Sequence, residues 1–255
     1  MSTTTLKRKS VYNVDDTDET VLNHDILAQR IIQEPVPKGL QKYWNGRYRL
    51  FSRFDEGIWL DYQSWYSVTP ESTANRIAED IIKKYQPDVV IDAFSGCGGN
   101  TIQFAKRAYV IGLEIDPVKI AFARHNLDVY NVDQSRVIFM QGDVLDSLQS
   151  LKFPAQMRVV VFMSPPWGGP SYSQKDAYSL SDLTPYPFEA LYKQALKITP
   201  FVAAFLPKHT DLYELADYGD LTNRVHIQHF AHNGVPRTMC CYFNSPLLPN
   251  DANIE

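Results

Sequence analysis

The segment with the most distinctive chemistry is SPPWGGP at residues 164–170, which follows the apolar run RVVVFM at 158–163. Its two prolines restrict the backbone, so the carbonyl of Pro165 points in one direction, and Ser164 places a hydroxyl beside it. Trp167 adds a large flat face, and the glycines after it leave room for a planar ligand. The alternative is a purely structural one, in which the segment forms a rigid turn and its tryptophan packs against the protein. We favour a slot that holds an exocyclic amino group on a flat ring.

An exocyclic amine on a purine is a weak nucleophile because its lone pair is delocalised into the ring. Two acceptors for its hydrogens, Ser164 and the Pro165 carbonyl, would aim that lone pair at an electrophilic methyl group. Catalysis would then rest mainly on alignment and electrostatics. Trp167 would stack on the ring, and a cationic 7-methylguanine would add a cation–π energy of about 0.5–2 kcal/mol.

A second group of residues predicts a cofactor site. The glycines of DAFSGCGGNT (92–101) fit neither the dinucleotide-binding nor the P-loop spacing. Asp92 suits the α-amino group of S-adenosylmethionine and would repel a pyrophosphate, while Gly96 lets the backbone approach the ligand. Glu114 could accept hydrogen bonds from ribose hydroxyls, and Asp143 from the adenine amine. Each carboxylate alone also fits a strand-end cap, but three of them after successive strands favour the cofactor.

Hydrophobic patterns predict the elements that position these residues. A helix is expected at 24–33, and another begins at Thr69-Pro70-Glu71, with Thr69 as its cap, and runs to about residue 85. The further expected helices are 100–107, 117–130, 186–197 and 211–218. The expected strands are 88–94, 109–114, 136–140, 158–163, 201–206, 225–230 and 238–243, the last two as an antiparallel pair. This alternation predicts an α/β fold with a doubly wound Rossmann-like sheet and a small N-terminal helical or irregular appendage.

The expected organisation is a disordered tail at 1–23, an appendage at 24–70 that contributes to the cofactor and cap sites, a methyltransferase domain at 71–245 and a flexible tail at 246–255. The net charge of −4 argues against a protein that coats nucleic acid through phosphate contacts alone. A local RNA site remains open, because five cations without an acidic residue fall between 38 and 53: Lys38, Lys42, Arg47, Arg49 and Arg53.

Other sequence features limit the cellular setting. No run of about 18 apolar residues predicts a membrane span, and the N-terminus lacks a secretory signal. The three cysteines, two of them adjacent, predict neither a disulfide framework nor a zinc site, and no metal is expected. An intracellular, reducing compartment is the default expectation.

With WYSVTPE, DAFSGCGGNTIQFA, EIDPVKIAFARHN and SPPWGGPSY taken together, the chain resembles the trimethylguanosine synthase family over about residues 38–245. That family converts 7-methylguanosine caps of small nuclear and nucleolar RNAs to 2,2,7-trimethylguanosine. The resemblance implies that the sheet is a class I methyltransferase sheet, with a cofactor site of Ser67, Thr69, Asp92, Gly96, Glu114 and Asp143. It also implies that Ser164, Pro165 and Trp167 hold the guanine, that Asn126 contacts the base edge, and that the cap phosphates are reached by Lys42, Tyr172, Lys208 and Arg237.

The sequence departs from the family pattern at two positions. Ser95 replaces a common cysteine, a change expected to be harmless, and Lys208 replaces an arginine, which loosens the expected phosphate contact because lysine lacks the bidentate fork. The resemblance also implies a monomer, a location in the nucleus and nucleolus with the cytoplasm as a further site, and ribonucleoprotein core proteins as partners. The alternatives are an amino-methyltransferase acting on guanine or adenine in other nucleic acid, and a cap-binding module without catalysis.

Overall fold

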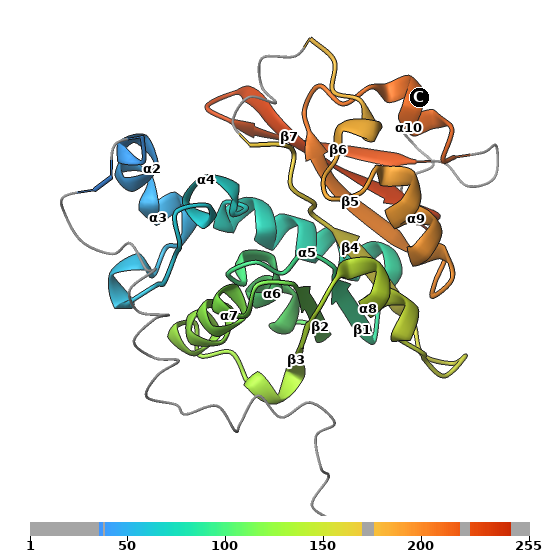
Figure 1. Ribbon diagram of the computed structural model, residues 1–255, viewed down its shortest axis with the longest axis horizontal. Coiled ribbons are helices and arrows are strands. Elements are labelled where there is room, and N and C mark those ends of the chain that lie inside the picture. The colour runs from blue at the N-terminus through green and yellow to red at the C-terminus, as the bar shows by residue number, and fades with distance from the viewer. Residues whose placement is uncertain (1–35, 38, 170–175, 220–224, 246–255) are drawn as a thin grey trace, which may run out of the picture.

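A mixed sheet lies at the centre of the protein and helices cover both of its faces (Figure 1). The computed structural model describes residues 36–37, 39–169, 176–219 and 225–245. Its seven strands have the order β3-β2-β1-β4-β5-β7-β6, parallel from β3 to β5, with β7 antiparallel to both of its neighbours. The strands are β1 Val89–Asp92, β2 Tyr109–Glu114, β3 Val137–Gln141, β4 Val159–Met163, β5 Val202–Pro207, β6 His226–His232 and β7 Val235–Phe243.

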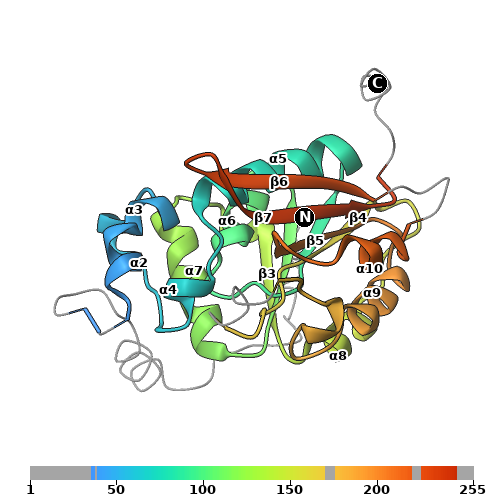
Figure 2. The same ribbon diagram turned by 90° about the horizontal axis from the view of Figure 1, so that it is seen from above.

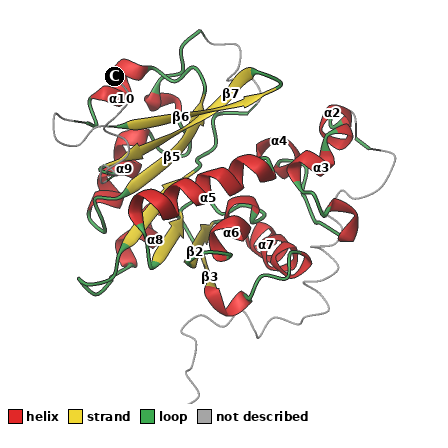
Figure 3. Ribbon diagram, turned by 180° about the vertical axis from the view of Figure 1, so that it is seen from behind, coloured by secondary structure: helices red, strands yellow, loops and turns green. Residues whose placement is uncertain are grey.

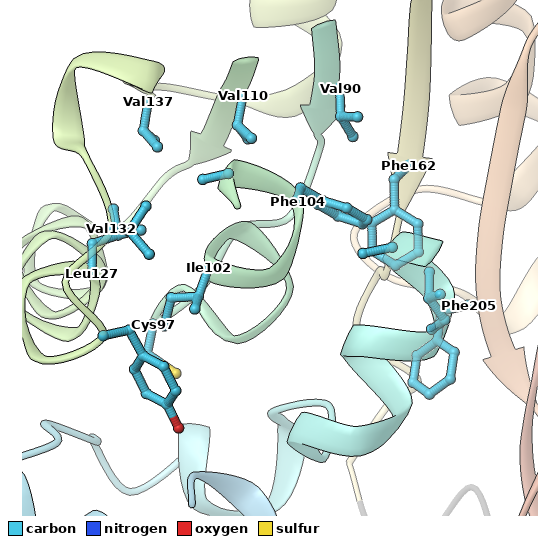
Figure 4. Close-up of a cluster of buried hydrophobic side chains, with 14 of the residues drawn as sticks. Val90, Cys97, Ile102, Phe104, Val110, Leu127, Val132, Val137, Phe162 and Phe205 are labelled. Atoms are coloured by element: carbon cyan, nitrogen blue, oxygen red, sulfur yellow. The ribbon is translucent and has the colours of Figure 1, made fainter. Parts of the chain in front are cut away.

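The central strands are apolar at consecutive positions because both faces of the sheet are covered. Alternate side chains enter two different cores. Val90 and Phe162 face the first core, where Phe162 meets Phe104 of a covering helix with ring centroids 5.0 Å apart (Figure 4). Ile91 and Met163 face the second core. An apolar run of this kind therefore indicates a buried parallel strand, as the sequence predicts.

Helices cover each face of the sheet (Figures 2 and 3), and within the described residues there are three on each. The first face carries α5 Glu71–Tyr85, α6 Gly99–Ala105 and α7 Pro117–Val129. The second carries α8 Val144–Ser150, α9 Phe188–Leu196 and α10 Leu212–Ala216. Short 3₁₀ turns at Gln134–Arg136 and Leu180–Asp182 join some of these elements.

The segment before α5 forms short helices around an aromatic cluster. They are α2 Gln41–Asn45, α3 Arg47–Leu50, η1 Phe54–Glu56 and α4 Ser64–Ser67. Trp65 is completely buried, with ring centroids 5.6 Å from Trp44 and 5.4 Å from Phe54. Because these rings also belong to the first core of the sheet, the appendage packs directly on the helices around residues 92–101, here called the glycine loop.

The predicted fold class is confirmed, and the local differences have physical reasons. The helix α8 escapes sequence analysis because seven residues carry too little periodicity. Thr69 does not cap α5: its Oγ1 accepts a hydrogen bond from Asn100 Nδ2 at 3.1 Å, Pro70 occupies the cap position, and the helix begins at Glu71. The helix expected at 24–33 lies outside the described residues. Within the described part of the chain, no helix is long and apolar enough to cross a membrane.

Candidate active site

The two segments with predicted chemistry meet where the strand order of the sheet reverses. Strand β1 lies between β2 and β4. The chain builds β2 and β3 on one side of β1, and then β4 and β5 on the other side. Ligands of such sheets bind at this switch point. Asp92 ends β1, and Ser164 directly follows β4. The Ser164 hydroxyl donates a hydrogen bond to the carbonyl of Phe94 at 3.5 Å. The glycine loop and the SPPW turn are therefore direct neighbours.

Asp92 is a fully buried carboxylate with one oxygen unused. Its Oδ2 accepts a hydrogen bond from Thr101 Oγ1 at 2.6 Å, whereas its Oδ1 has no partner among the described residues. Burial raises the pKa of Asp92 to about 7, the Thr101 hydroxyl opposes this rise, and the charge of Glu114 adds to it. A buried acceptor without a partner fits a ligand ammonium group, so the site suits the α-amino end of S-adenosylmethionine.

The carboxylate of Glu114 holds the glycine loop against the end of β2. Its Oε2 accepts a hydrogen bond from the Gly96 amide at 3.0 Å, and its Oε1 accepts from the amides of Ile115 and Asp116. Gly98 has a φ of +91°, and a Cβ at this position would lie 3.2 Å from Ala123 on α7. The loop is therefore shaped by its own structural contacts. The ribose contact of Glu114 stays a prediction.

Asp143 caps helix α8 in the structure. Its Oδ1 accepts hydrogen bonds from the amides of Leu145 at 2.9 Å and Asp146 at 3.5 Å. Its Oδ2 accepts from the Tyr186 hydroxyl at 3.1 Å. Capping is thus the role that the described residues give this carboxylate, and its contact with the adenine amine stays a prediction.

The SPPWGG turn is anchored on one side and leaves an acceptor open on the other. The Pro166 carbonyl accepts hydrogen bonds from the Thr184 amide and hydroxyl, both at 3.2 Å. No described residue donates a hydrogen bond to the Pro165 carbonyl. Since the Ser164 hydroxyl donates its hydrogen to Phe94, its lone pairs remain for a ligand. Ser164 and Pro165 therefore offer two acceptors next to the cofactor loop.

Trp167 is partly buried and rests on the ring of Phe205, with centroids 5.4 Å apart and the ring planes inclined at 46°. The two glycines that follow have φ values of +84° and +78°, and no atom of the described residues lies within 4 Å of a Cβ placed on either. The described residues therefore leave space beside the turn, and the indole is only partly buried. A planar ring has room at this position.

Three of the four predicted phosphate contacts can be placed. Pro207 at the end of β5 pairs with Thr238 of β7, and the neighbours of this pair, Lys208 and Arg237, are both exposed. An anion near both cations would be stabilising. Lys42 is exposed on α2, with its Nζ 4.7 Å from the centre of the Tyr43 ring. Tyr172 lies outside the described residues.

Asn126 does not have its amide free for a base. Its Oδ1 accepts a hydrogen bond from the Trp59 amide at 2.9 Å. Its Nδ2 donates to the carbonyls of Trp59 at 3.0 Å and Cys97 at 2.9 Å. Both amide hydrogens are used and the side chain is completely buried, so no N–H of Asn126 is left for a base edge, and the expected contact stays a prediction. Instead Asn126 joins the appendage to the glycine loop.

The two remaining predicted residues stand where the appendage meets the cofactor loop. The Oγ1 of the buried Thr69 accepts from Asn100, which follows the glycine loop, and the exposed Ser67 donates its hydroxyl to the Gln63 carbonyl at 2.9 Å. Sequence reasoning missed Thr101 as the partner of Asp92, and Asn100, whose buried Oδ1 has no partner in the described part of the chain. Their place in the first turn after the glycine loop is the signal that points to them.

Comparisons with known proteins agree with this geometry. A family model described as RNA cap guanine-N2 methyltransferase matches residues 87–246. The trimethylguanosine synthase of Schizosaccharomyces pombe is 60% identical over 227 residues, covering 89% of this chain and 95% of the relative. The trimethylguanosine synthase of Saccharomyces cerevisiae is 38% identical, covering 77% of this chain and 63% of the relative. A crystal structure assigned as a methyltransferase from Porphyromonas gingivalis W83 shares the fold, with a TM-score of 0.62 at 16% identity, over 92% of this chain and 61% of that one.

Proposed function

Because this chain belongs to the RNA cap guanine-N2 methyltransferase family, we propose that it methylates the N2 amine of a 7-methylguanosine cap with S-adenosylmethionine. The products would be 2,7-dimethylguanosine and then 2,2,7-trimethylguanosine. The names of the two yeast relatives support the second methylation.

One observation carries the proposal at the level of atoms. The open acceptors of the SPPW turn lie beside a loop whose buried Asp92 carboxylate has an unused oxygen. An ammonium group held by Asp92 would fix the cofactor on the glycine loop, and its sulfonium would supply the methyl group. The amine and the methyl group would thus be held on adjacent strands.

The residues of the turn would act by alignment. Ser164 and the Pro165 carbonyl would accept the two hydrogens of the N2 amine, so its lone pair points away from them toward the methyl group. The nitrogen would form a bond to the methyl carbon as the sulfur–carbon bond breaks, which would leave S-adenosylhomocysteine. The nitrogen would become strongly acidic during this step and lose its proton to solvent, so a dedicated high-pKa base is not required.

Trp167 would select the cap over ordinary guanine. Stacking on indole is stronger for the positively charged 7-methylguanine ring, by about 0.5–2 kcal/mol, than for a neutral ring. Lys208 and Arg237 would contact the cap phosphates from the edge of the sheet, and Lys42 from the appendage. The cationic base and the phosphates would be recognised by different groups.

The RNA targets, partners and location rest on the family resemblance. We infer that the substrates are capped small nuclear and small nucleolar RNAs, met in the nucleus and nucleolus and also in the cytoplasm. The enzyme would act as a monomer, with ribonucleoprotein core proteins as partners that deliver the RNA.

The proposal is tested by incubating the protein with S-adenosylmethionine and either 7-methyl-GDP or GDP, and counting added methyl groups by mass spectrometry. We expect one and two methyl groups on 7-methyl-GDP and none on GDP. Trp167→Ala should lower kcat/KM for 7-methyl-GDP by about 100-fold, because it removes both the stack and the cation–π energy.

Cofactor affinity, measured by calorimetry, should be unchanged in Trp167→Ala. Equal methylation of 7-methyl-GDP and GDP would contradict the cap assignment and leave an amino-methyltransferase of broader substrate range. Absence of cofactor binding by the wild-type protein, with or without 7-methyl-GDP, would favour a cap-binding module without catalysis.

A further inference from the structure

Three tyrosines of the appendage form an exposed aromatic surface, here called the tyrosine patch: Tyr43, Tyr62 and Tyr66. Tyr62 is 49% exposed, and the other two are partly exposed. The ring of Tyr66 lies between its neighbours, with centroids 6.1 Å from Tyr62 and 6.4 Å from Tyr43. Rings at these spacings support one another and still present surface to solvent.

Two lysines border the tyrosine patch. The Nζ of Lys42 lies 4.7 Å from the centre of the Tyr43 ring. The Nζ of Lys119, from α7, donates a hydrogen bond to Oε1 of Gln63 at 2.6 Å, next to Tyr62. Neither lysine forms a salt bridge with any residue that the structure describes. One oxygen of the nearby Asp61 carboxylate, Oδ1, accepts a hydrogen bond from the amide of Ser64 at 2.6 Å.

The tyrosine patch stands at the rim of the candidate active site. Tyr66 belongs to α4, which contacts α2 and ends two residues before Thr69, the residue bonded to Asn100 after the glycine loop. Figure 1 shows α4 between the outer helix α2 and the start of α5. The proposed function places Lys42 at the cap phosphates, and because Lys42 borders the tyrosine patch, the nucleotides after the cap would have this surface within reach.

The chemistry of the tyrosine patch fits single-stranded nucleic acid. Unpaired bases stack on aromatic side chains while nearby cations contact the phosphates, and such stacking tolerates any base. Surfaces that bind single strands combine stacking rings with cations for the backbone phosphates, and the two lysines beside these three rings supply that combination. We propose that the tyrosine patch binds the single-stranded nucleotides that follow the cap. This inference rests on the proposed function, because it requires a capped RNA substrate.

The test compares KM for 7-methyl-GDP with KM for a capped single-stranded RNA of about ten nucleotides, a length typical of such binding sites. The wild-type protein should have the lower KM for the capped RNA. Tyr62→Ala should raise KM for the capped RNA by about five- to tenfold, at the low end of the effects of removing a stacking ring, and leave KM for 7-methyl-GDP unchanged. Tyr62→Phe keeps the ring and should retain the low KM.

Tyr109→Ala is the matched control, because Tyr109 is 59% exposed at the start of β2. It lies at the amino ends of the parallel strands, whereas the candidate site lies at their carboxyl ends. It should change neither KM. An equal KM for both substrates in the wild-type protein, or a capped-RNA KM that Tyr62→Ala leaves unchanged, would overturn RNA binding here and leave the tyrosine patch to a protein partner. Failure of the wild-type protein to methylate 7-methyl-GDP would instead overturn the proposed function.

Discussion

Asp92 links the electrostatics of the candidate site to its ligand. A completely buried carboxyl group is costly to ionise, which is why burial raises the pKa of Asp92 to about 7 although the Thr101 hydroxyl opposes this rise. A ligand ammonium group would reverse this preference, because it favours the ionised form. Binding of the cofactor should therefore be coupled to the release of a proton near neutral pH.

The first prediction is that cofactor affinity rises with pH through about 7. Below the pKa of Asp92, binding must first remove a proton, so the Kd should increase toward tenfold for each pH unit lowered. Asp92→Asn should bind at least about tenfold more weakly at pH 8, and its Kd should be nearly independent of pH. Calorimetry between pH 6 and 8, roughly one unit on each side of this pKa, measures both effects.

The stability of the same variant provides the control. The folded pKa of Asp92 is raised above its ordinary value of 3.8, so ionisation opposes folding increasingly as pH rises from about 4 to about 7. Asp92→Asn removes this effect, and without cofactor it should melt at pH 8 no lower than the wild-type protein. A wild-type Kd that does not change between pH 6 and 8 would contradict the ammonium contact.

At the scale of elements, the appendage and the glycine loop are connected through Asn126 on α7. This one amide pairs with both backbone groups of Trp59 and also donates to the Cys97 carbonyl. The neighbouring His125 stacks on Trp59 with ring centroids 3.6 Å apart, and its Nε2 lies 2.7 Å from the Gly57 carbonyl. The position of the glycine loop therefore depends on the packing of the appendage against α7.

We expect Asn126→Asp to weaken cofactor binding in a way that acid partly reverses. A carboxylate would face two carbonyl oxygens where the amide donated hydrogens, which is unfavourable in a buried site. Protonation of the new carboxyl would restore one donor. The Kd of this variant, relative to wild type at the same pH, should therefore improve as pH falls from 8 to 6, over roughly the range in which buried carboxyls titrate.

His125→Ala is the matched comparison, because it removes the stack on Trp59 and keeps all three hydrogen bonds of Asn126. It should leave the cofactor Kd within about twofold, as expected when a partly exposed contact is lost. A penalty in Asn126→Asp that is constant from pH 6 to 8 would show that the loss of the donors is not its cause.

Across the whole molecule, one set of stabilising contacts lies at the end of the sheet opposite to the candidate site. Tyr85 at the end of α5 is 1% exposed, and its hydroxyl lies within hydrogen-bond distance of the carbonyls of Val202 at 3.0 Å and Phe243 at 2.9 Å. These residues begin β5 and end β7, far along the strands from Ser164. The hydroxyl ties the longest covering helix to the antiparallel part of the sheet.

Tyr85→Phe should lower the free energy of unfolding by about 1–2 kcal/mol, because the buried carbonyls lose their hydroxyl partner while the ring packing is kept. Chemical denaturation measures this change. The kcat and KM for 7-methyl-GDP should stay at wild-type values at temperatures below the transition. An altered KM in the fully folded variant would show that the Tyr85 contacts and the candidate site are coupled through the sheet.

Local rules predict much of this fold because they act over short stretches. Five apolar runs appear as parallel strands within a few residues of their predicted ends, since a two-sided core requires consecutive apolar residues. The turn at Ser164 and the loop at Asp92 were recognisable because prolines, glycines and a carboxylate stand directly after such strands. The antiparallel pairing of β6 with β7 also follows from local pattern.

What the sequence determined by itself was the type of sheet, the two loops with chemistry and the family they resemble, because each depends on residues close together in the chain. Only the tertiary structure decided which polar groups remain available. The sequence suggested Asn126 as a ligand residue, and the folded chain uses both of its amide hydrogens in bonds to Trp59 and Cys97. One oxygen of Asp92, in contrast, has no partner among the described residues. Hydrogen-bond partners dozens of residues apart meet only when the chain is folded, so their pairing cannot be read from local spacing.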